Sequence, residues 1–337
     1  MQSINKELNT YQGSLLADNT NIIASYDVEQ GEKYTSIKML REDIIANKAL
    51  NKIKFKISNS KHVNIINGFG VTLGDSIIGL NVCLFIKEMN EKIKINIARP
   101  CTTPESLESL YYYALQAGIF DSVTRMPFPL SECNQYDFNI DMGNQLYRND
   151  FQSLEMHDYF FEHMGISPHI VPHTYKKNHW LKRLPNEIKN KGEYILFCPN
   201  ASTQIRAIPY KYHTQVIESM AKKYNLPVLG FSPAKAELYT DISLQVTNTL
   251  SYINVIRNSN FVYTADSSAV HIAAGFDIPC HCIFTSIDPD LRIRYYPNCT
   301  SSFIGDAVTQ GLHFTESREI IHHVQKLYEN HFKFNSH

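Results

Sequence analysis

The chain has 337 residues, which is more than one typical domain, and we expect two domains that each bury a core of their own. Charged residues make up 19% of the chain and the formal net charge is −1, so no excess of basic residues is available to attract nucleic acid. The sequence has no apolar run of about 18 residues and does not open with a signal-peptide pattern, so we expect a cytosolic enzyme without a transmembrane segment.

Residues 1–60 are predicted to form an N-terminal appendage rich in β-structure. Three segments there have strand patterns without intervening helices: 21–28, 32–40 and 52–58. After them the pattern changes to alternating strands and helices, at 62–67 (strand), 76–89 (helix), 92–98 (strand) and 104–117 (helix). This alternation predicts a first Rossmann-like lobe over residues 61–180.

A glycine-rich stretch, Gly68-Phe-Gly-Val-Thr-Leu-Gly-Asp-Ser76, joins the first strand of this lobe to its first helix. Glycines at such a junction let the backbone turn tightly and approach a ligand closely. The spacing is not the dinucleotide fingerprint, and no acidic ribose partner follows the second strand, so nicotinamide chemistry is disfavoured. Asp75 is placed where a carboxylate could take a proton from an acceptor hydroxyl. Its alternative role is to cap the helix.

The polar, basic stretch 173–191 has no apolar period and is expected to link two lobes. Beyond it, strands and helices alternate again, which predicts a second Rossmann-like lobe over residues 181–337 with a parallel sheet covered on both faces. Ligands are expected at the carboxyl ends of such strands. The predicted strands are 194–198, 226–231, 260–264 and 280–284, and the predicted helices are 212–224, 233–239, 250–257 and 316–332.

A polar loop, 198–209, follows the first strand of the second lobe. Ser202 and Thr203 offer hydroxyls there, and the planar guanidinium of Arg206 can bind two phosphate oxygens at once. The alternative is a surface loop with one solvated arginine.

A second junction, Asp266-Ser-Ser-Ala-Val-His271, follows the strand predicted at 260–264 and opens a helix. The first turn of that helix would present unpaired N–H groups and the positive end of the helix dipole to an anion. Ser267 and Ser268 could add hydroxyl donors, and His271 lies one turn further on the same face. The alternative is that Asp266 or Ser267 caps the helix and that His271 is a hydrogen-bonded histidine of the core.

The cysteines number seven and are scattered through apolar segments, which fits reduced thiols in the core better than a disulfide framework. Cys280-His281-Cys282 is a candidate metal-binding motif. Alternation along a strand would send Cys280 and Cys282 to one face and His281 to the other, and no second pair of ligands completes four. We therefore expect no metal site there.

Together these segments resemble glycosyltransferase family 9, the heptosyltransferases of bacterial lipopolysaccharide assembly. The resemblance rests on Gly74-Asp75 before an apolar helix, on the loop 199–209 and on 266–279 followed by 284–289, and it covers roughly residues 62–330. It implies the GT-B fold, an α/β architecture in which two Rossmann-like lobes with parallel sheets face a cleft. It also implies that ADP-heptose is held mainly by the second lobe and that the anomeric centre is inverted without a metal or another cofactor.

The resemblance implies a role for each matching residue. Asp75, which follows Gly74, matches the family's proposed base. Ala207 and Ile208 replace an arginine and an aromatic residue of the family's phosphate loop, and Ser268 replaces a glycine. The residues implied to hold the donor diphosphate are Ser202, Thr203, Arg206, Ser267, Ser268 and His271, with Asp266 and Gly74 supporting the pocket.

We therefore expect an inverting, metal-independent glycosyltransferase that moves a sugar, by default heptose from ADP-heptose, to a hydroxyl of a cell-envelope glycan or protein. A lipid-linked acceptor is equally compatible, and it would bring a cytoplasmic enzyme to the periphery of the inner membrane. Two alternatives stay open. One is a sugar-nucleotide epimerase of similar fold, and the other is a non-catalytic scaffold that binds a nucleotide sugar.

Overall fold

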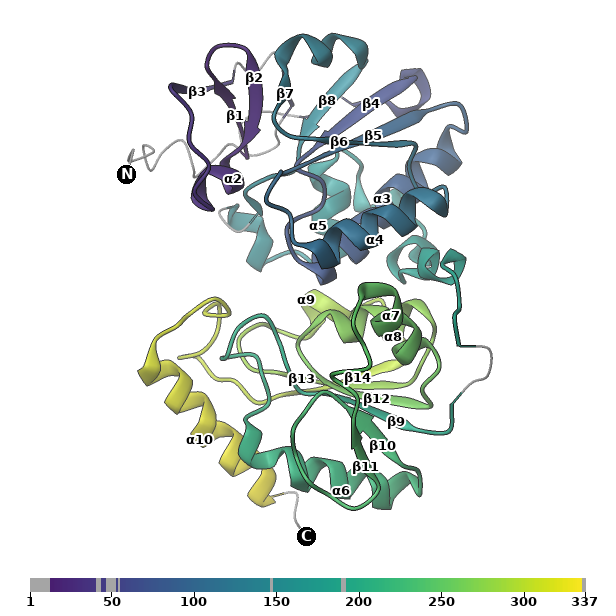
Figure 1. Ribbon diagram of the computed structural model, residues 1–337, viewed down its shortest axis with the longest axis vertical. Coiled ribbons are helices and arrows are strands. Elements are labelled where there is room, and N and C mark those ends of the chain that lie inside the picture. The colour runs from purple at the N-terminus through teal and green to yellow at the C-terminus, as the bar shows by residue number, and fades with distance from the viewer. Residues whose placement is uncertain are drawn as a thin grey trace. The chain divides into compact units, whose positions relative to one another are not determined.

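The structure, a computed structural model, describes residues 13–40, 44–46, 53, 55–145, 148–188 and 192–334. The chain divides into two compact units, Met1–Lys176 and Lys177–His337. Each unit contains a parallel sheet joined by helices, as the alternating pattern predicts (Figure 1). Among the described residues, no helix is both long enough and apolar enough to cross a bilayer.

The parallel sheet of the first unit has the strand order β6-β5-β4-β8. Its strands are β4 (His62–Ile66), β5 (Lys94–Arg99), β6 (Ser122–Arg125) and β8 (Phe138–Asp141), and its helices are α3 (Leu73–Met89), α4 (Glu105–Gln116) and α5 (Met156–His163). The strands predicted at 62–67 and 92–98 and the helices predicted at 76–89 and 104–117 are therefore confirmed. Almost all of α3 from residue 76 to 86 is buried, which explains why its sequence is apolar on every side.

A small antiparallel sheet, β3-β1-β2-β7, lies beside it in the same unit (Figure 1). It is formed by β1 (Ser14–Ala17), β2 (Asn21–Ala24), β3 (Ile37–Met39) and β7 (Phe128–Pro129), with helix α2 (Ser25–Glu29) after β2. The strands predicted at 21–28 and 32–40 are thus shorter than expected. Residues 52 and 54 of the third predicted strand lie outside the described residues. Residues 57–58 belong instead to a turn, η1 (Ile57–Asn59), because Ser58 and Asn59 favour turns and their side chains bond to each other.

The N-terminal strands are tied into the first unit by two buried carboxylates. Asp141, at the end of β8, accepts from the backbone N–H groups of Gly13 and Ser14 at 3.0 and 3.2 Å. Asp27, in α2, accepts from the backbone N–H groups of Cys101 and Thr102, both at 2.9 Å. Buried carboxylates need such donors because an unpaired one would lose its hydration without compensation. The first strands are therefore part of the construction of this unit.

The second unit is a six-stranded parallel sheet with the order β11-β10-β9-β12-β13-β14. The strands are β9 (Ile195–Cys198), β10 (Val228–Gly230), β11 (Tyr239–Asp241), β12 (Phe261–Ala265), β13 (Cys280–Phe284) and β14 (Cys299–Phe303). The helices are α6 (His213–Tyr224), α7 (Thr249–Arg257), α8 (Ser268–Gly275), α9 (Asp290–Ile293) and α10 (Arg318–Phe334). Its main core contains β9 residues together with apolar side chains of α6 and α10.

Two elements of this unit differ from the prediction. The helix predicted at 233–239 is wrong: residues 233–238 are irregular and β11 follows them. Leu238 takes a left-handed backbone (φ 60), and the Tyr239 hydroxyl bonds to both the N–H and the C=O of Ser232, which fixes a loop instead of a helix. β14 was not predicted, because its central residues are threonine and serine and show no apolar pattern.

The stretch expected to be a polar linker is partly packed. Residues 173–183 form two short turns, η6 (His173–Lys176) and η7 (His179–Arg183), which border the division between the units. Trp180 and Leu181 are buried, with η7 against α8. These two apolar residues are adjacent and have polar residues on both sides, so they leave no periodic signal in the sequence.

Alternation along β13 is confirmed. Cys280 and Cys282 are buried on one face, while His281 on the other face pairs with the hydroxyls of Thr300 and Ser302 on β14 at 2.9 and 3.1 Å. Burial also raises the pKa of both thiols well above the usual value. These cysteines are therefore inert core residues at neutral pH.

Candidate functional site

The candidate donor site lies at the carboxyl edge of the second unit's sheet, where the loops after β9 and β12 meet. Arg206 joins them. Its Nε lies 3.0 Å from Oδ2 of Asp266, and its Nε and Nη2 donate to the backbone carbonyl of Asp266 at 3.1 and 2.6 Å. Its Nη1 donates to Oγ of Ser202 at 3.2 Å. The structure thus brings together three of the residues that the sequence singled out.

This ion pair is sheltered from water. The Arg206 side chain is 17% exposed and that of Asp266 only 6%. Charge-assisted hydrogen bonds of this kind are short and directional. Arg206 is therefore fixed in place by the protein itself, in contrast to the solvated arginine of the alternative interpretation.

Ser267 caps α8. Its Oγ accepts from the backbone N–H of Ala269 at 3.3 Å and lies 3.0 Å from the hydroxyl of Thr264. Ser268 is the first residue of the helix and is partly exposed. The capping role considered from the sequence is thus present for Ser267, and it leaves the rest of the first turn at the edge of the sheet.

His271 is a buried histidine with internal partners. Its Nδ1 lies 3.0 Å from the hydroxyl of Tyr296, and its backbone carbonyl accepts from Asn178 Nδ2 at 3.0 Å. Asn178 also donates to the Tyr296 hydroxyl at 2.8 Å. This network matches the alternative of a hydrogen-bonded core histidine, and it joins η7, α8 and the segment after α9.

Two residues that the sequence did not single out, Arg292 and His313, also lie at this edge. Thr203 Oγ1 donates to the backbone carbonyl of His313 at 2.8 Å, which draws the loop after β14 toward the loop after β9. Burial, followed by the positive charges of Arg292 and Arg206, lowers the pKa of His313 to about 4. Arg292 itself is only 8% exposed. No motif marks either residue, and His313 follows a strand that has no apolar pattern.

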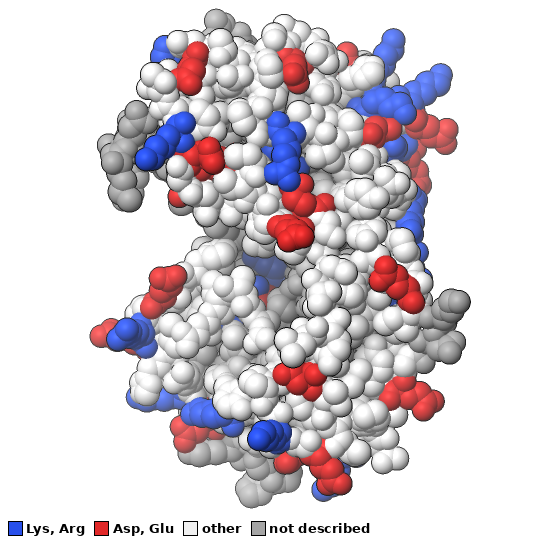
Figure 2. Space-filling view, viewed as in Figure 1, with Lys and Arg blue, Asp and Glu red and all other residues white. Residues whose placement is uncertain are grey.

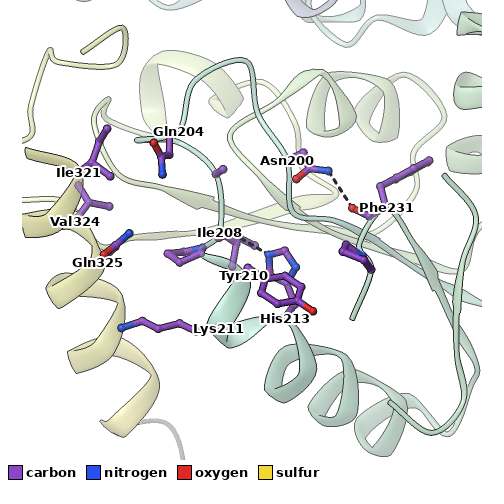
Figure 3. Close-up of a pocket in the computed structure, with 13 residues that line it drawn as sticks. Asn200, Gln204, Ile208, Tyr210, Lys211, His213, Phe231, Ile321, Val324 and Gln325 are labelled. Atoms are coloured by element: carbon purple, nitrogen blue, oxygen red, sulfur yellow. Dashed lines mark hydrogen bonds between the residues drawn. The ribbon is translucent and has the colours of Figure 1, made fainter. Parts of the chain in front are cut away.

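A pocket of about 510 Å³ borders the 199–209 loop (Figure 3). Ala207 and Ile208 line it, together with aromatic and polar side chains that include Tyr210, Phe231 and Gln325. Ile208 is 2% exposed and belongs to the main core of the unit. Ala207 and Ile208 thus form part of the wall of this cavity, together with the aromatic side chains of Tyr210 and Phe231.

Asp75 lies in the first turn of α3 in the first unit, next to Gly74. The helix begins at Leu73, earlier than predicted, because Thr72 caps it: Thr72 Oγ1 accepts from Asp75 N at 3.5 Å and donates to Asp75 Oδ2 at 2.8 Å. Residues 70–75 are all partly exposed. Asp75 therefore takes part in the cap and is still accessible to a substrate.

The turn before Asp75 rests on a fully buried arginine. Arg99 donates to the backbone carbonyls of Asn67 and Gly70, both at 3.0 Å, and its guanidinium stacks 4.2 Å from the centre of the Tyr111 ring. Gly68 has φ +61, and a Cβ there would lie 2.5 Å from Arg99 Nη1. Only glycine fits this position, so the glycine-rich stretch is fixed by close packing.

Comparison with known proteins places this geometry in a fold class. No protein-family model matches the sequence, and no curated protein matches it either. The structure, however, has the GT-B glycosyltransferase fold expected above. It is similar to ADP-heptose LPS heptosyltransferase II from E. coli, with a TM-score of 0.53 and 10% sequence identity, over 80% of this chain and 99% of that one.

Two further solved structures are similar at lower scores. A glycosyltransferase family 9 protein from Veillonella parvula has a TM-score of 0.47 and 10% identity, over 80% of this chain and 96% of that one. The iron-containing dodecameric glycosyltransferase TibC from E. coli has a TM-score of 0.46 and 12% identity, over 83% of this chain and 67% of that one.

Proposed function

We propose that the protein is an inverting, metal-independent glycosyltransferase that uses a nucleotide-diphosphate sugar, with ADP-heptose as the default donor. The observation that carries the proposal is the meeting of Ser202, Arg206 and Asp266 at the carboxyl edge of a parallel sheet, in a chain with the GT-B fold. That edge is where ligands bind in open α/β sheets.

The second unit would bind the donor. The Ser202 hydroxyl, the backbone N–H of Thr203 and the first turn of α8 would supply neutral donors to the diphosphate, and Arg206 would supply positive charge. Without a metal, these groups must stabilise the negative charge that develops on the departing diphosphate. In this proposal Ser267, Ser268 and His271 act through the position of α8, since Ser267 caps it and His271 anchors it to Tyr296.

Asp75 of the first unit would act as the general base. Its carboxylate would accept the proton of the acceptor hydroxyl as that oxygen attacks the anomeric carbon, and the bond to the diphosphate would break. The Thr72 hydroxyl at 2.8 Å orients one carboxylate oxygen, Oδ2, in the first turn of a helix.

The acceptor in this proposal is a hydroxyl of a cell-envelope glycan, a lipid-linked glycan or a protein. An enzyme acting on such acceptors from the cytoplasm would work at or near the inner membrane.

Incubation of the full chain with ADP-heptose and a panel of other nucleotide sugars tests the proposal. We expect slow release of free nucleotide, because water can replace the missing acceptor. Interconversion of the sugar without release of nucleotide would indicate the epimerase instead. Binding without either reaction would indicate the scaffold, and it would contradict the proposed activity.

A further inference from the structure

Four loops converge at the carboxyl edge of the second unit's sheet. They follow β9, β12, β13 and β14, which are neighbours in the sheet order. These loops and the segments after them include, in the same order, Arg206, Asp266, Arg292 and His313. We call these four residues the edge cluster. Because parallel strands end at the same side of a sheet, such loops share a single surface.

Hydrogen bonds hold these loops against one another. Thr203 Oγ1 donates to His313 O at 2.8 Å, and Thr285 Oγ1, after β13, donates to Ile205 O at 2.9 Å. The backbone N–H of Gly311 donates to Ser286 O, also at 2.8 Å. The loops after β9, β13 and β14 are therefore a connected assembly, and their side chains are held at fixed positions.

The edge cluster contains more positive than negative charge. Asp266 forms an ion pair with Arg206, with 3.0 Å between Oδ2 and Nε. Arg292, 8% exposed, donates from Nη1 to the backbone carbonyl of Leu291 at 2.9 Å. Two guanidinium groups thus accompany one carboxylate in a setting that is largely shielded from water, where electrostatic interactions are strong.

A polar group without a partner lies in the same assembly. Ser286 is fully buried, and its Oγ has no hydrogen-bond partner among the described residues. A buried hydroxyl without a partner costs stability, so it is retained where a ligand or a water satisfies it.

We propose that Arg292 and His313 complete the anion site that begins at Arg206, and that His313 takes up a proton when a nucleotide diphosphate binds there. The inference rests on the proposed function for the identity of the anion. It adds to that function a second cation and a pH dependence of donor binding.

The direction of the proton movement follows from the charges around His313. In the free protein, burial and then the charges of Arg292 and Arg206 lower the pKa of His313, Asp266 raises it, and the net result is a pKa of about 4. The ring is therefore neutral near pH 7. A bound diphosphate would neutralise the arginines and favour the charged ring, so the pKa would rise on binding and a proton would enter from solvent. Donor affinity should accordingly increase as the pH falls from 7 toward 5.

Isothermal titration of the full chain with ADP-glucose, UDP-glucose and GDP-mannose tests this proposal. Each probe carries a diphosphate diester, whose charge stays constant between pH 5 and 8, so a pH dependence must come from the protein. Measurements in two buffers of different ionisation enthalpy at about pH 5.5 give the number of protons taken up with the ligand. We expect net uptake by the wild type and none by the His313→Asn variant.

Arg292→Gln should weaken binding of the best probe by about tenfold or more, since it removes a charge-assisted contact. Arg294→Gln is the matched control, because Arg294 is two residues away, exposed and paired with Asp290 at 2.6 Å. Its affinity should stay within about twofold of wild type.

If Arg206→Gln loses binding while Arg292→Gln keeps it, the inference is wrong and the proposed function stands. If the wild type binds neither ADP-heptose nor any of the three probes, both are wrong. Should Arg292→Gln fail to fold, the wild-type titration is decisive, because an absence of proton uptake overturns the proposal.

Discussion

Arg206 is the residue whose interpretation the structure changes most. An arginine in a loop after a strand suggests a free cation for phosphate, yet its guanidinium contacts both the carboxylate and the carbonyl of Asp266. Its first contribution is therefore to hold two loops together. Any phosphate contact has to be made by those N–H groups that the pairing leaves accessible.

This pairing predicts a large effect on folding stability. Arg206→Ala would leave the Asp266 carboxylate buried without a counter-charge, and we expect a loss of about 3 kcal/mol in the free energy of unfolding. Adding Asp266→Asn to that variant should restore part of the loss. Urea denaturation of the two single variants and the double variant measures this coupling. Strict additivity would show that the ion pair contributes nothing to stability.

Asp75 gives a prediction about turnover. Asp75→Asn keeps a side chain that can accept from Thr72 but removes the base, so we expect kcat to fall by about a hundredfold or more. Nucleotide affinity should stay within about twofold, because the change affects a transition-state interaction. Steady-state kinetics beside nucleotide titration separate the two quantities. Unchanged turnover would mean that Asp75 only caps α3, and an equal loss of donor affinity would exclude it as the base. Glu91→Gln, at an exposed position in the same unit, is the control.

The sequence could indicate a candidate site residue where its immediate neighbours form a recognisable local pattern. Asp266 and Ser267 were found because a strand, a polar pair and a small-residue helix follow one another. Arg292 and His313 were not, because their importance depends on which loops the sheet order brings together. The sequence around Arg292 or His313 contains no pattern that predicts which loops lie next to one another.

At the scale of elements, Asp141 connects the most distant parts of the first unit. Its carboxylate accepts from Gly13 N, Ser14 N, Asn67 Nδ2 and Gly143 N, at 2.8 to 3.2 Å. It thereby joins the antiparallel sheet to the ends of two parallel strands. The network lies immediately beside Gly68, where the glycine-rich stretch begins.

Asp141→Ala should destabilise the first unit by about 3 kcal/mol or more, because four donors, three of them in buried hydrogen bonds, lose their acceptor at once. Asp141→Asn should retain part of that stability, since one oxygen remains. Chemical denaturation followed by circular dichroism measures both variants. A loss below about 1 kcal/mol in the alanine variant would contradict the connecting role.

Elements with a strong apolar period were predicted well, and elements defined by their neighbours were not. β9 is fully buried, β12 and β13 are mostly apolar and mostly buried, and all three are confirmed. β11 and β14 are the two edges of their sheet, where polar residues suffice because only one side pairs. The periodic signal fails where burial on both faces ends.

At the scale of the whole molecule, two units with separate cores predict separable responses to a ligand. In calorimetry of the full chain, saturating nucleotide sugar should raise the melting temperature of the transition that belongs to the second unit. At a hundredfold excess of ligand over Kd, the expected gain in the free energy of unfolding is about 3 kcal/mol. The Asp141→Ala variant identifies the other transition, which should shift with that substitution and not with the ligand. A single transition that responds to both would show that the units unfold together.

The bond between Gly13 and Asp141 spans 128 residues, and this separation bears on the order of events during synthesis. β2 leaves the ribosome more than a hundred residues before the strand β7 and the Asp141 carboxylate that complete this part of the structure. Until then β2 has an open edge that can pair with another chain. Early release of truncated chains should therefore favour aggregation, and the first unit can reach its native state only when translation has passed residue 141.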